Sequence, residues 1–428
     1  MVKASYLQQA ILVIAFTLTG LAGCLPKTQH LTLAQQTQKM NEFVATGGYA
    51  SDENHRIKST REIWLHDSVL LDTTLVMPED SGRYPVIIYL PGLGEDANAG
   101  AIWRQQWAQA GYAVFTVQPM SVATALKGLD ALPQQANFNK EEEDNDLSRL
   151  QNLRYSDLHY VGRAYFSNAD LIKRLAHLAF AVNELKQRAQ QPTSVYAALD
   201  LNNLVIAGYE LGAQTATALL EQNPAITIPT ALSAIKPKAT VLLSPVVDLA
   251  AGDVSHRFQK LSSPMLAITG PNDTDDYGVS IPELRTTIWE YAPSGNKYLL
   301  MLDEAEHTLF SGSHFEARHS SEQPKGARPP GPDGAEPPGL TELQSMHFNI
   351  GVSAGAGPMG FGNMAPPGIN PRHDSAATVH AYKTIAIIRS VTTAFLDSLV
   401  KAKTNAKQWV NSSDFQLWSG KRAELKIK

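Results

Sequence analysis

The sequence predicts an α/β domain with a mostly parallel central sheet flanked by helices. From Glu62 onward, short apolar runs alternate with longer stretches in which apolar residues recur every three or four positions. This alternation is typical of strand–helix–strand units. Most of the short runs are apolar and β-branched, as expected for strands that are covered by helices on both faces.

Two apolar stripes are predicted to be helices, and seven short runs are predicted to be strands. The stripe over residues 171–185 has apolar residues at three- and four-residue spacing, which gives one core-facing helix surface. A second stripe predicts a last helix over about Ala377–Ala402. The expected strands are Leu70–Val76, Val86–Leu90, Ala113–Val117, Leu204–Ala207, Thr240–Ser244, Met265–Thr269 and Tyr298–Leu302.

The composition is that of an ordinary globular protein, with 43% hydrophobic and 18% charged residues. The 36 Lys and Arg residues against 41 Asp and Glu residues give a net charge of −5. Because no basic stripe stands out, nucleic acid is not expected as a partner. The single cysteine, Cys24, excludes an intramolecular disulfide and a cysteine-rich zinc site. We expect no cofactor and no metal ion.

The start of the chain has the features of a secretory signal peptide. Lys3 and the amino terminus supply positive charge, and residues 10–20 form an apolar run that is short for a bilayer crossing. Residues 1–23 are therefore predicted to be a leader that is removed. The alternative is an uncleaved anchor helix.

The apolar run ends in the sequence Leu-Ala-Gly-Cys, whose cysteine is Cys24. This sequence resembles the lipobox of bacterial lipoproteins, in which a lipid is attached to the cysteine sulfur and cleavage occurs before the cysteine. The resemblance implies a protein of the cell envelope that contacts the membrane through a lipid anchor. Leu25, in place of an acidic residue, resembles lipoproteins sent to the periplasmic face of an outer membrane.

The remaining chain divides into a tether, residues 24–58, and a domain, residues 59–428. Two stretches interrupt the alternation within the domain. Residues 120–160 include a run of acidic residues and are expected to form a cap or a loop insertion. Residues 312–376 are predicted to be a Gly/Pro-rich insertion before the last helix, because residues 324–371 hold ten glycines and ten prolines in 48 positions.

Residues 204–213, LVIAGYELGA, predict a strand, a sharp turn and a helix. They match the nucleophile elbow Gly-x-Ser-x-Gly at Gly208 and Gly212, but Glu210 occupies the serine position. Upstream, residues 84–95, YPVIIYLPGLGE, predict a strand that ends in a Gly-rich loop. A loop of this kind can supply backbone donors for an oxyanion.

Two further strands end in groups with acid–base chemistry. The run that begins at Met265 leads into an acidic loop, and the run that begins at Leu299 leads to Ala-Glu-His, ending at His307. Along the chain, the nucleophile position therefore comes first, the acid second and the histidine third, which is the order that sites with this nucleophile elbow require.

Together these motifs resemble the α/β-hydrolase family, and in particular the dienelactone hydrolase-like esterases. That group includes chlorophyllase-like and platelet-activating-factor acetylhydrolase-like enzymes. The likeness covers roughly residues 60–310 and the last helix, and it implies a small-molecule or lipid-like ester as substrate. Two departures matter. Pro91 stands where such enzymes often have the histidine of a His-Gly oxyanion motif, and Glu210 replaces the attacking hydroxyl.

The resemblance implies catalytic roles for Glu210 and His307, and it implies an oxyanion hole formed by the backbone amides of Leu93 and Leu211. Asp273 best matches the acid of the triad, with Asp275 and Asp276 as alternatives. Each of the three aspartates could instead stabilise a turn. Ser244 follows a predicted strand but lacks an elbow, and it is interpreted as a turn cap.

Three roles are open for the carboxylate of Glu210. It could attack an electrophilic carbon, as the aspartate of haloalkane dehalogenases and epoxide hydrolases does. It could accept hydrogen bonds from the Leu93 and Leu211 amides and so block the hole. It could also pair with His307 as the remnant of a triad. The first role predicts a hydrolase of ester-like or electrophilic substrates, and the other two are compatible with a non-catalytic binding or scaffold lipoprotein.

Overall fold

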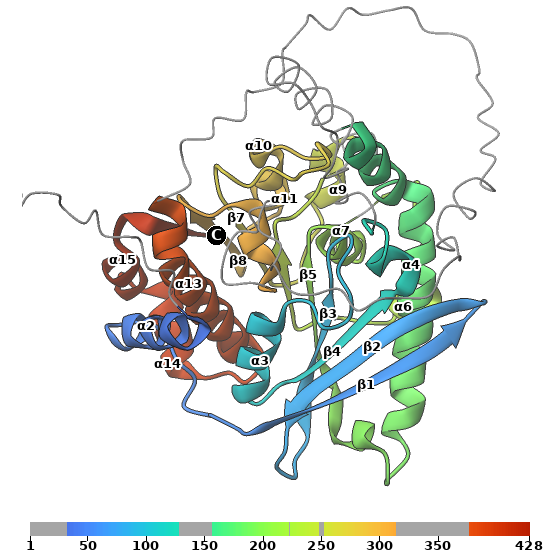
Figure 1. Ribbon diagram of the computed structural model, residues 1–428, viewed down its shortest axis with the longest axis horizontal. Helices are drawn as coiled ribbons and strands as arrows, with labels where there is room; N and C mark the ends of the chain where they lie inside the picture. The colour runs from blue at the N-terminus through green and yellow to red at the C-terminus, as the bar shows by residue number, and fades with distance from the viewer. Residues whose placement is uncertain (1–31, 128–155, 222, 248–251, 314–375) are drawn as a thin grey trace, which may run out of the picture.

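The computed structural model describes residues 32–127, 156–221, 223–247, 252–313 and 376–428 (Figure 1). Nine strands in the described residues form one sheet. Their bounds are β1 Ile57–His66, β2 Val69–Pro78, β3 Tyr84–Leu90, β4 Ala113–Pro119, β5 Leu199–Tyr209, β6 Ala239–Leu243, β7 Met265–Thr269, β8 Lys297–Leu302 and β9 Ala423–Ile427.

The helices connect and flank these strands. The α-helices are α2 Leu33–Ala45, α3 Ala101–Gln109, α4 Met120–Ala123, α6 Asn168–Ala189, α7 Leu211–Ala218, α8 Thr230–Ser233, α9 Val254–Phe258, α10 Pro282–Arg285, α11 Thr287–Tyr291, α13 Ala376–Leu399, α14 Thr404–Asn411 and α15 Asp414–Ser419. Short 3-10 helices lie at η1 Val195–Ala198, η3 His307–Ser311 and η4 Gly420–Arg422.

The sheet is mixed but mostly parallel, with the order β1-β2-β4-β3-β5-β6-β7-β8-β9. Neighbouring strands from β4 through β3, β5, β6 and β7 to β8 pair in parallel. The hairpin of β1 and β2 joins antiparallel to β4, and β9 joins antiparallel to β8. The chain therefore has an α/β fold, as the alternation of runs predicts.

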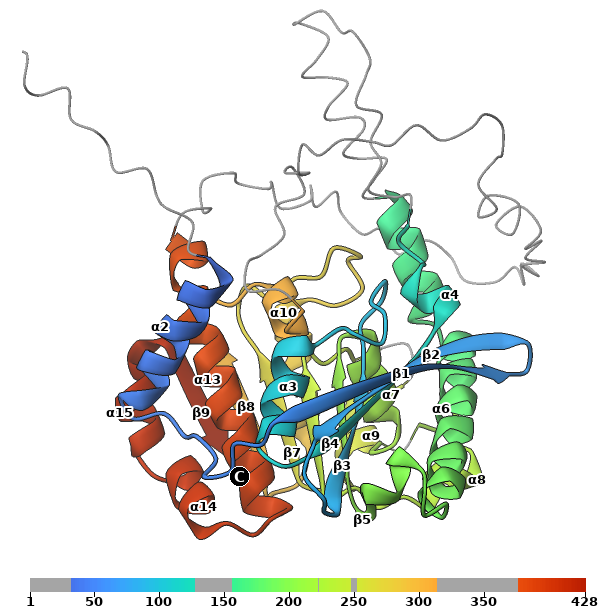
Figure 2. The same ribbon diagram turned by 60° about the horizontal axis from the view of Figure 1, so that its bottom comes forward.

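Two apolar layers cover the two faces of the sheet (Figure 2). One contains residues of α2, α3, α13 and α14, with Trp103, Trp107 and Phe395 fully buried. The other contains residues of α6, α7, α8, α9 and α11, with Phe115 and Phe258 fully buried. Burial on both faces explains why the central strands are apolar along their whole length.

The seven predicted strands lie at β2 to β8, and the two predicted stripes lie on α6 and α13. The strands β1 and β9 were not predicted. The tether prediction does not hold for residues 33–45, because they form α2, whose Met40 is 2% exposed within the core. Thr32 caps this helix through its side chain, in a capping box with Gln35.

Several predictions lie outside the described residues. These are the leader 1–23 with Cys24, the part of the 120–160 stretch that covers 128–155, and residues 314–375 of the insertion. None of the helices in the described ranges combines the length and the apolarity that a bilayer crossing needs.

Candidate active site

The predicted site residues meet at one edge of the sheet. Leu93 follows β3, Glu210 follows β5, Asp273 follows β7 and His307 follows β8. Because these strands are parallel, their carboxyl ends lie at the same edge, which is where ligands bind in open α/β sheets.

The turn between β5 and α7 presents Glu210 in a strained backbone conformation. Its φ is +49° and its ψ is −105°, which is a backbone conformation that residues other than glycine rarely adopt. A Cβ on Gly208 would lie 2.4 Å from the Gly212 backbone, and one on Gly212 would lie 1.9 Å from the Leu90 carbonyl oxygen. Glycine is therefore required on both sides of Glu210 for strand and helix to approach so closely.

Glu210 is 2% exposed, and both oxygens of its carboxylate have partners. Oε1 lies 3.1 Å from Nε2 of His307. Oε2 accepts a hydrogen bond of 2.9 Å from the backbone amide of Leu93. Within the described chain, no hydrogen bond joins the carboxylate to the Leu211 amide, so only one of the two predicted oxyanion donors contacts it.

His307 links the elbow to Asp273. Its Nδ1 lies 2.7 Å from Oδ1 of Asp273, so the imidazole ring is held between two carboxylates. Asp273 is fully buried and also accepts hydrogen bonds from Thr269 at 2.7 Å and from Ser244 at 2.8 Å. Three polar side chains, those of His307, Thr269 and Ser244, thus hold the Asp273 carboxylate.

Arg285 explains how the acidic loop tolerates burial. Its guanidinium is fully buried, with Nε 2.8 Å from the Asp273 carbonyl oxygen and 3.4 Å from Oδ1 of the same residue. Its Nη2 lies 2.8 Å from Asp275, which in turn accepts three amides of its own loop. Asp275 is therefore a structural loop residue, and Asp276 is exposed. Of the three candidate acids, Asp273 is the one that contacts His307.

The charges of the two carboxylates set the protonation of His307. Burial alone would lower the pKa of this imidazole, but the hydrogen bonds and charges of Asp273 and Glu210 outweigh it and raise the pKa to about 9. Burial alone would raise the pKa of Asp273, but His307 and Arg285 hold it below its ordinary value. At neutral pH the ring is therefore an imidazolium between two carboxylates.

Two residues of the site were not among the predicted catalytic groups. Ser244, interpreted as a turn cap, follows β6 with a φ of +50°, and its Oγ lies 3.1 Å from Nδ1 of His307. Glu95 accepts a hydrogen bond from the Gly92 amide at 2.9 Å and one from the Ser313 hydroxyl at 2.9 Å. Burial raises the pKa of Glu95 to about 7, with the Glu210 charge acting in the same direction.

The surroundings of the elbow are apolar. Six buried side chains pack together there, contributed by the loop after β3, by α4 and α7, and by neighbouring loops. They are Leu93, Val122, Phe166, Leu211, Val246 and Tyr277. Such a lining suits an apolar small molecule with a few polar contacts at its reactive end.

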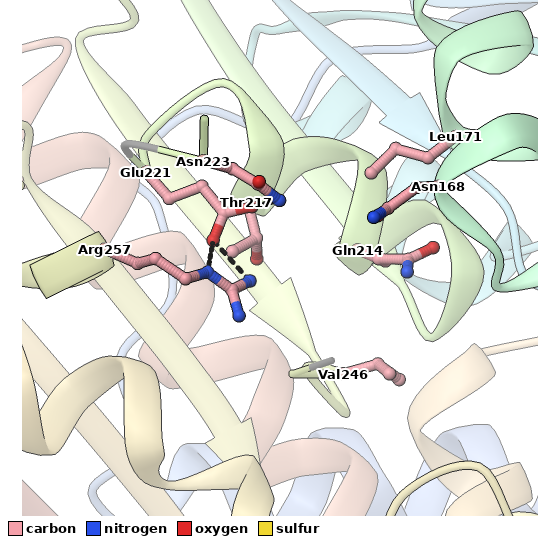
Figure 3. A pocket seen from close by; sticks show the side chains of 8 residues that line it. All are labelled: Asn168, Leu171, Gln214, Thr217, Glu221, Asn223, Val246 and Arg257. Atoms are coloured by element: carbon pink, nitrogen blue, oxygen red, sulfur yellow. Dashed lines mark hydrogen bonds and ion pairs between the residues drawn. The ribbon is translucent and has the colours of Figure 1, made fainter. Parts of the chain in front are cut away.

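A separate small cavity lies beside α7 (Figure 3). Its wall includes a buried ion pair in which Nη2 of Arg257 lies 2.6 Å from Oε2 of Glu221. None of Glu210, His307 and Asp273 lines it. Its lining is Asn168, Leu171, Gln214, Thr217, Glu221, Asn223, Val246 and Arg257.

Within the described ranges, no group of three or more His, Cys, Asp or Glu side chains is arranged to hold a metal ion. A comparison of the chain with protein-family models and with curated proteins found no match. The function is therefore inferred from the geometry of the site.

Proposed function

We propose that this chain is a cell-envelope lipoprotein whose α/β-hydrolase domain hydrolyses ester-like or electrophilic substrates, with Glu210 as the nucleophile. Three features support the α/β-hydrolase assignment: the strained turn from β5 to α7, the amide donor in the loop after β3, and the chain order Glu210, Asp273, His307. The lipid anchor and the envelope location are proposed from the sequence around Cys24.

One observation carries the proposed chemistry. The two oxygens of Glu210 have different partners: Oε2 is held by the Leu93 amide, and Oε1 faces the His307 imidazolium. This arrangement suits a carboxylate that attacks with one oxygen while the other becomes the carbonyl oxygen of an ester.

In the first step, Oε1 of Glu210 attacks an electrophilic carbon, such as a ring carbon of an epoxide. The carbon–oxygen bond of the ring breaks, and the departing oxygen takes the proton from Nε2 of His307. The product of this step is a glutamyl ester that carries a free hydroxyl group. The raised pKa of His307 provides the proton at neutral pH.

The first step also prepares the second one. Esterification removes the negative charge of Glu210, so one of the two groups that raise the pKa of His307 is lost. The neutral imidazole then takes a proton from water, and the hydroxide adds to Cδ of the ester. The Leu93 amide stabilises the negative charge that develops on Oε2. Collapse releases the alcohol, and proton transfer restores carboxylate and imidazolium.

Turnover of an epoxide panel and of a short-chain aryl ester tests the proposal. Wild type is expected to open an epoxide, and Glu210→Gln and His307→Ala are each expected to lose about a hundredfold or more in rate. Glu306→Gln removes an exposed acid next to His307 and serves as the matched control.

A single turnover in ¹⁸O-labelled water separates the covalent route from direct attack by water. The first product molecule should carry an unlabelled oxygen, because that oxygen comes from the Glu210 carboxylate. A labelled product in the first turnover would contradict the nucleophile role.

A second candidate function is supported by the burial of the same carboxylate. Glu210 is 2% exposed and bound at both oxygens, so it stands where an oxyanion would otherwise bind. In that case the chain is a non-catalytic binding or scaffold lipoprotein. Wild type would then be silent on every substrate, and Glu210→Ser would gain ester hydrolysis because a hydroxyl would again lie beside His307.

A further inference from the structure

The loop after β3 forms a tight turn over residues 92–95, and all four of its amides have partners. The Leu93 amide donates to Glu210 at 2.9 Å. The other three donate within the turn or to α4: Gly92 to the Glu95 side chain at 2.9 Å, Gly94 to the Val122 carbonyl at 3.1 Å and Glu95 to the Gly92 carbonyl at 3.4 Å. Of these amides, only that of Leu93 donates to the Glu210 carboxylate.

The direction of that amide is fixed from the opposite side of its peptide bond. The Gly92 carbonyl oxygen accepts a hydrogen bond of 2.9 Å from Nε2 of Gln118. In a planar trans peptide the carbonyl and the following N–H point in opposite directions. Holding the Gly92 carbonyl at Gln118 therefore directs the Leu93 amide to the other side, toward Glu210.

Gln118 is well placed to act as an anchor. It lies near the carboxyl end of β4 and is 4% exposed. Its Nε2 also donates to the Glu95 carbonyl oxygen at 3.1 Å, so one side-chain amide holds both ends of the turn. Both acceptors are carbonyl oxygens, which only the nitrogen of the side-chain amide can satisfy.

The turn needs such an anchor because residue 92 is glycine. A Cβ at Gly92 would lie 2.7 Å from the Tyr209 ring and 2.9 Å from Oε2 of Glu210, so a side chain would block the approach of the carboxylate. The same absence of a side chain leaves the peptide between Gly92 and Leu93 few steric barriers to rotation.

We propose that Gln118 is a positioning residue, which orients the Leu93 amide toward Glu210 by holding the Gly92 carbonyl. Gln118 does not touch the reacting atoms in this assignment. Its consequence for catalysis rests on the proposed function, because the Leu93 amide then stabilises the charge on Oε2 of the ester intermediate. Its consequence for the resting protein depends only on the geometry of the turn.

The resting geometry can be tested by NMR. Labelling with ¹³C-carbonyl glycine and ¹⁵N leucine selects leucines that follow glycine, and the chain has four such pairs. Leu93→Ile identifies the Leu93 peak by removing it. Glu210→Gln is expected to shift the Leu93 amide resonance in the wild-type background, because the charge of the acceptor is lost.

In the Gln118→Met background, the same Glu210→Gln change is expected to move the resonance by less than half as much. Gln118→Glu, which turns acceptors toward both carbonyls, should have the same effect and replaces Gln118→Met if that variant does not fold. Thr116→Val is the matched control, since Thr116 is also buried on β4 and its hydroxyl bonds Arg104 instead of the turn. A full shift in both Gln118 variants would overturn the proposal.

If wild type turns over an epoxide, single-turnover mass spectrometry can also measure how fast the ester on Glu210 forms and decays. Gln118→Met should slow decay of the ester on Glu210 by about tenfold or more and leave its formation nearly unchanged, since the oxyanion develops in the decay step. Equal slowing of formation and decay would contradict the positioning role. If wild type forms no ester at all, the proposed function fails, and the NMR comparison still decides the role of Gln118.

Discussion

A single carboxylate changes the electrostatics of the whole triad. A hydroxyl at the elbow would leave His307 with one charged neighbour, Asp273. With Glu210 in place, the imidazole lies between two carboxylates, 3.1 Å from one and 2.7 Å from the other. His307 therefore carries a proton at neutral pH, and in the proposed mechanism it acts as a base only after Glu210 loses its charge.

This arrangement predicts how His307 titrates and how the titration affects stability. Its pKa is raised from 6.5 to about 9 in the folded protein. The stabilisation is therefore fully present below pH 6.5 and is lost as the pH rises through 9. Glu210→Gln should lower the pKa of His307, because one carboxylate is removed, and should make the stability loss between pH 6.5 and 9 smaller.

Histidine NMR titration together with urea unfolding at a series of pH values measures both effects. His307→Gln assigns the resonance. The raised pKa of Glu95 acts in a different window, between its ordinary value of 4.5 and about 7. A His307 pKa that is the same in wild type and in Glu210→Gln would contradict the ion pair.

At the scale of the elements, the elbow is a place where a strand, a helix and a loop come into backbone contact. Gly212 at the start of α7 lies against the end of β3. Gly212→Ala is expected to destabilise the protein by about 3 kcal/mol or more, because the new Cβ would lie 1.9 Å from the Leu90 carbonyl oxygen and neither backbone can move freely.

Gly82→Ala is the control for this substitution. A Cβ at Gly82 would lie 2.9 Å from the Tyr84 hydroxyl, which is the end of a side chain and donates to the Asp80 carbonyl. Displacing this hydroxyl costs one hydrogen bond, so the expected destabilisation is about 1 kcal/mol and smaller than that of Gly212→Ala. Equal urea midpoints for the two variants would show that the elbow is looser than its contacts indicate.

The strands that could be predicted are those with both faces buried. In β3 and β4 nearly every residue is buried, so the apolar run is visible in the sequence. The strands β1 and β9 lie at the two edges of the sheet, and each has one buried residue, Trp64 and Ala423 respectively. The sequence of β1 is mostly polar, and β9, AELKI, is only five residues long, so neither forms the continuous apolar run that marks the central strands.

The same limit applies to the site. Glu210, His307 and Asp273 follow strands in a known order, so their meeting at one edge could be expected from the chain. The side chains that hold these three residues in place could not be predicted, because each of their contacts joins distant parts of the sequence. Ser244 reaches Asp273 across 29 positions, and Gln118 reaches the Gly92 carbonyl across 26. No periodic pattern or motif in the sequence identifies Ser244 or Gln118 as a contact of the site.

At the scale of the whole molecule, the N-terminal segment and the C-terminal helices form one unit. The helix α2 packs on α13, and the Tyr49 hydroxyl donates to the buried Asp397 at 2.8 Å. Tyr112 donates to the other oxygen of the same carboxylate at 2.9 Å. Residue 32, at which the described part of the chain begins, is close to Cys24 in the sequence.

This short separation has a consequence for the proposed lipoprotein. Seven residues lie between Cys24 and Thr32, and a fully extended chain spans at most about 3.5 Å per residue. If the Cys24 sulfur carries the lipid, Thr32 stays within roughly 30 Å of that sulfur. The lipid would therefore hold this end of the domain close to the membrane.

Metabolic labelling with a radioactive fatty acid tests the anchor. Cys24 is the only cysteine, so any thioether-linked lipid on the chain must be attached there. Wild type is expected to carry the label and to sediment with membranes, because buried acyl chains contribute about 0.8 kcal/mol per CH₂ group. Cys24→Ala should lose both properties, and Leu25→Ala, one residue further on, should keep the label. Equal labelling of wild type and Cys24→Ala would contradict lipid attachment at this cysteine, because the alanine variant has no sulfur there to carry it.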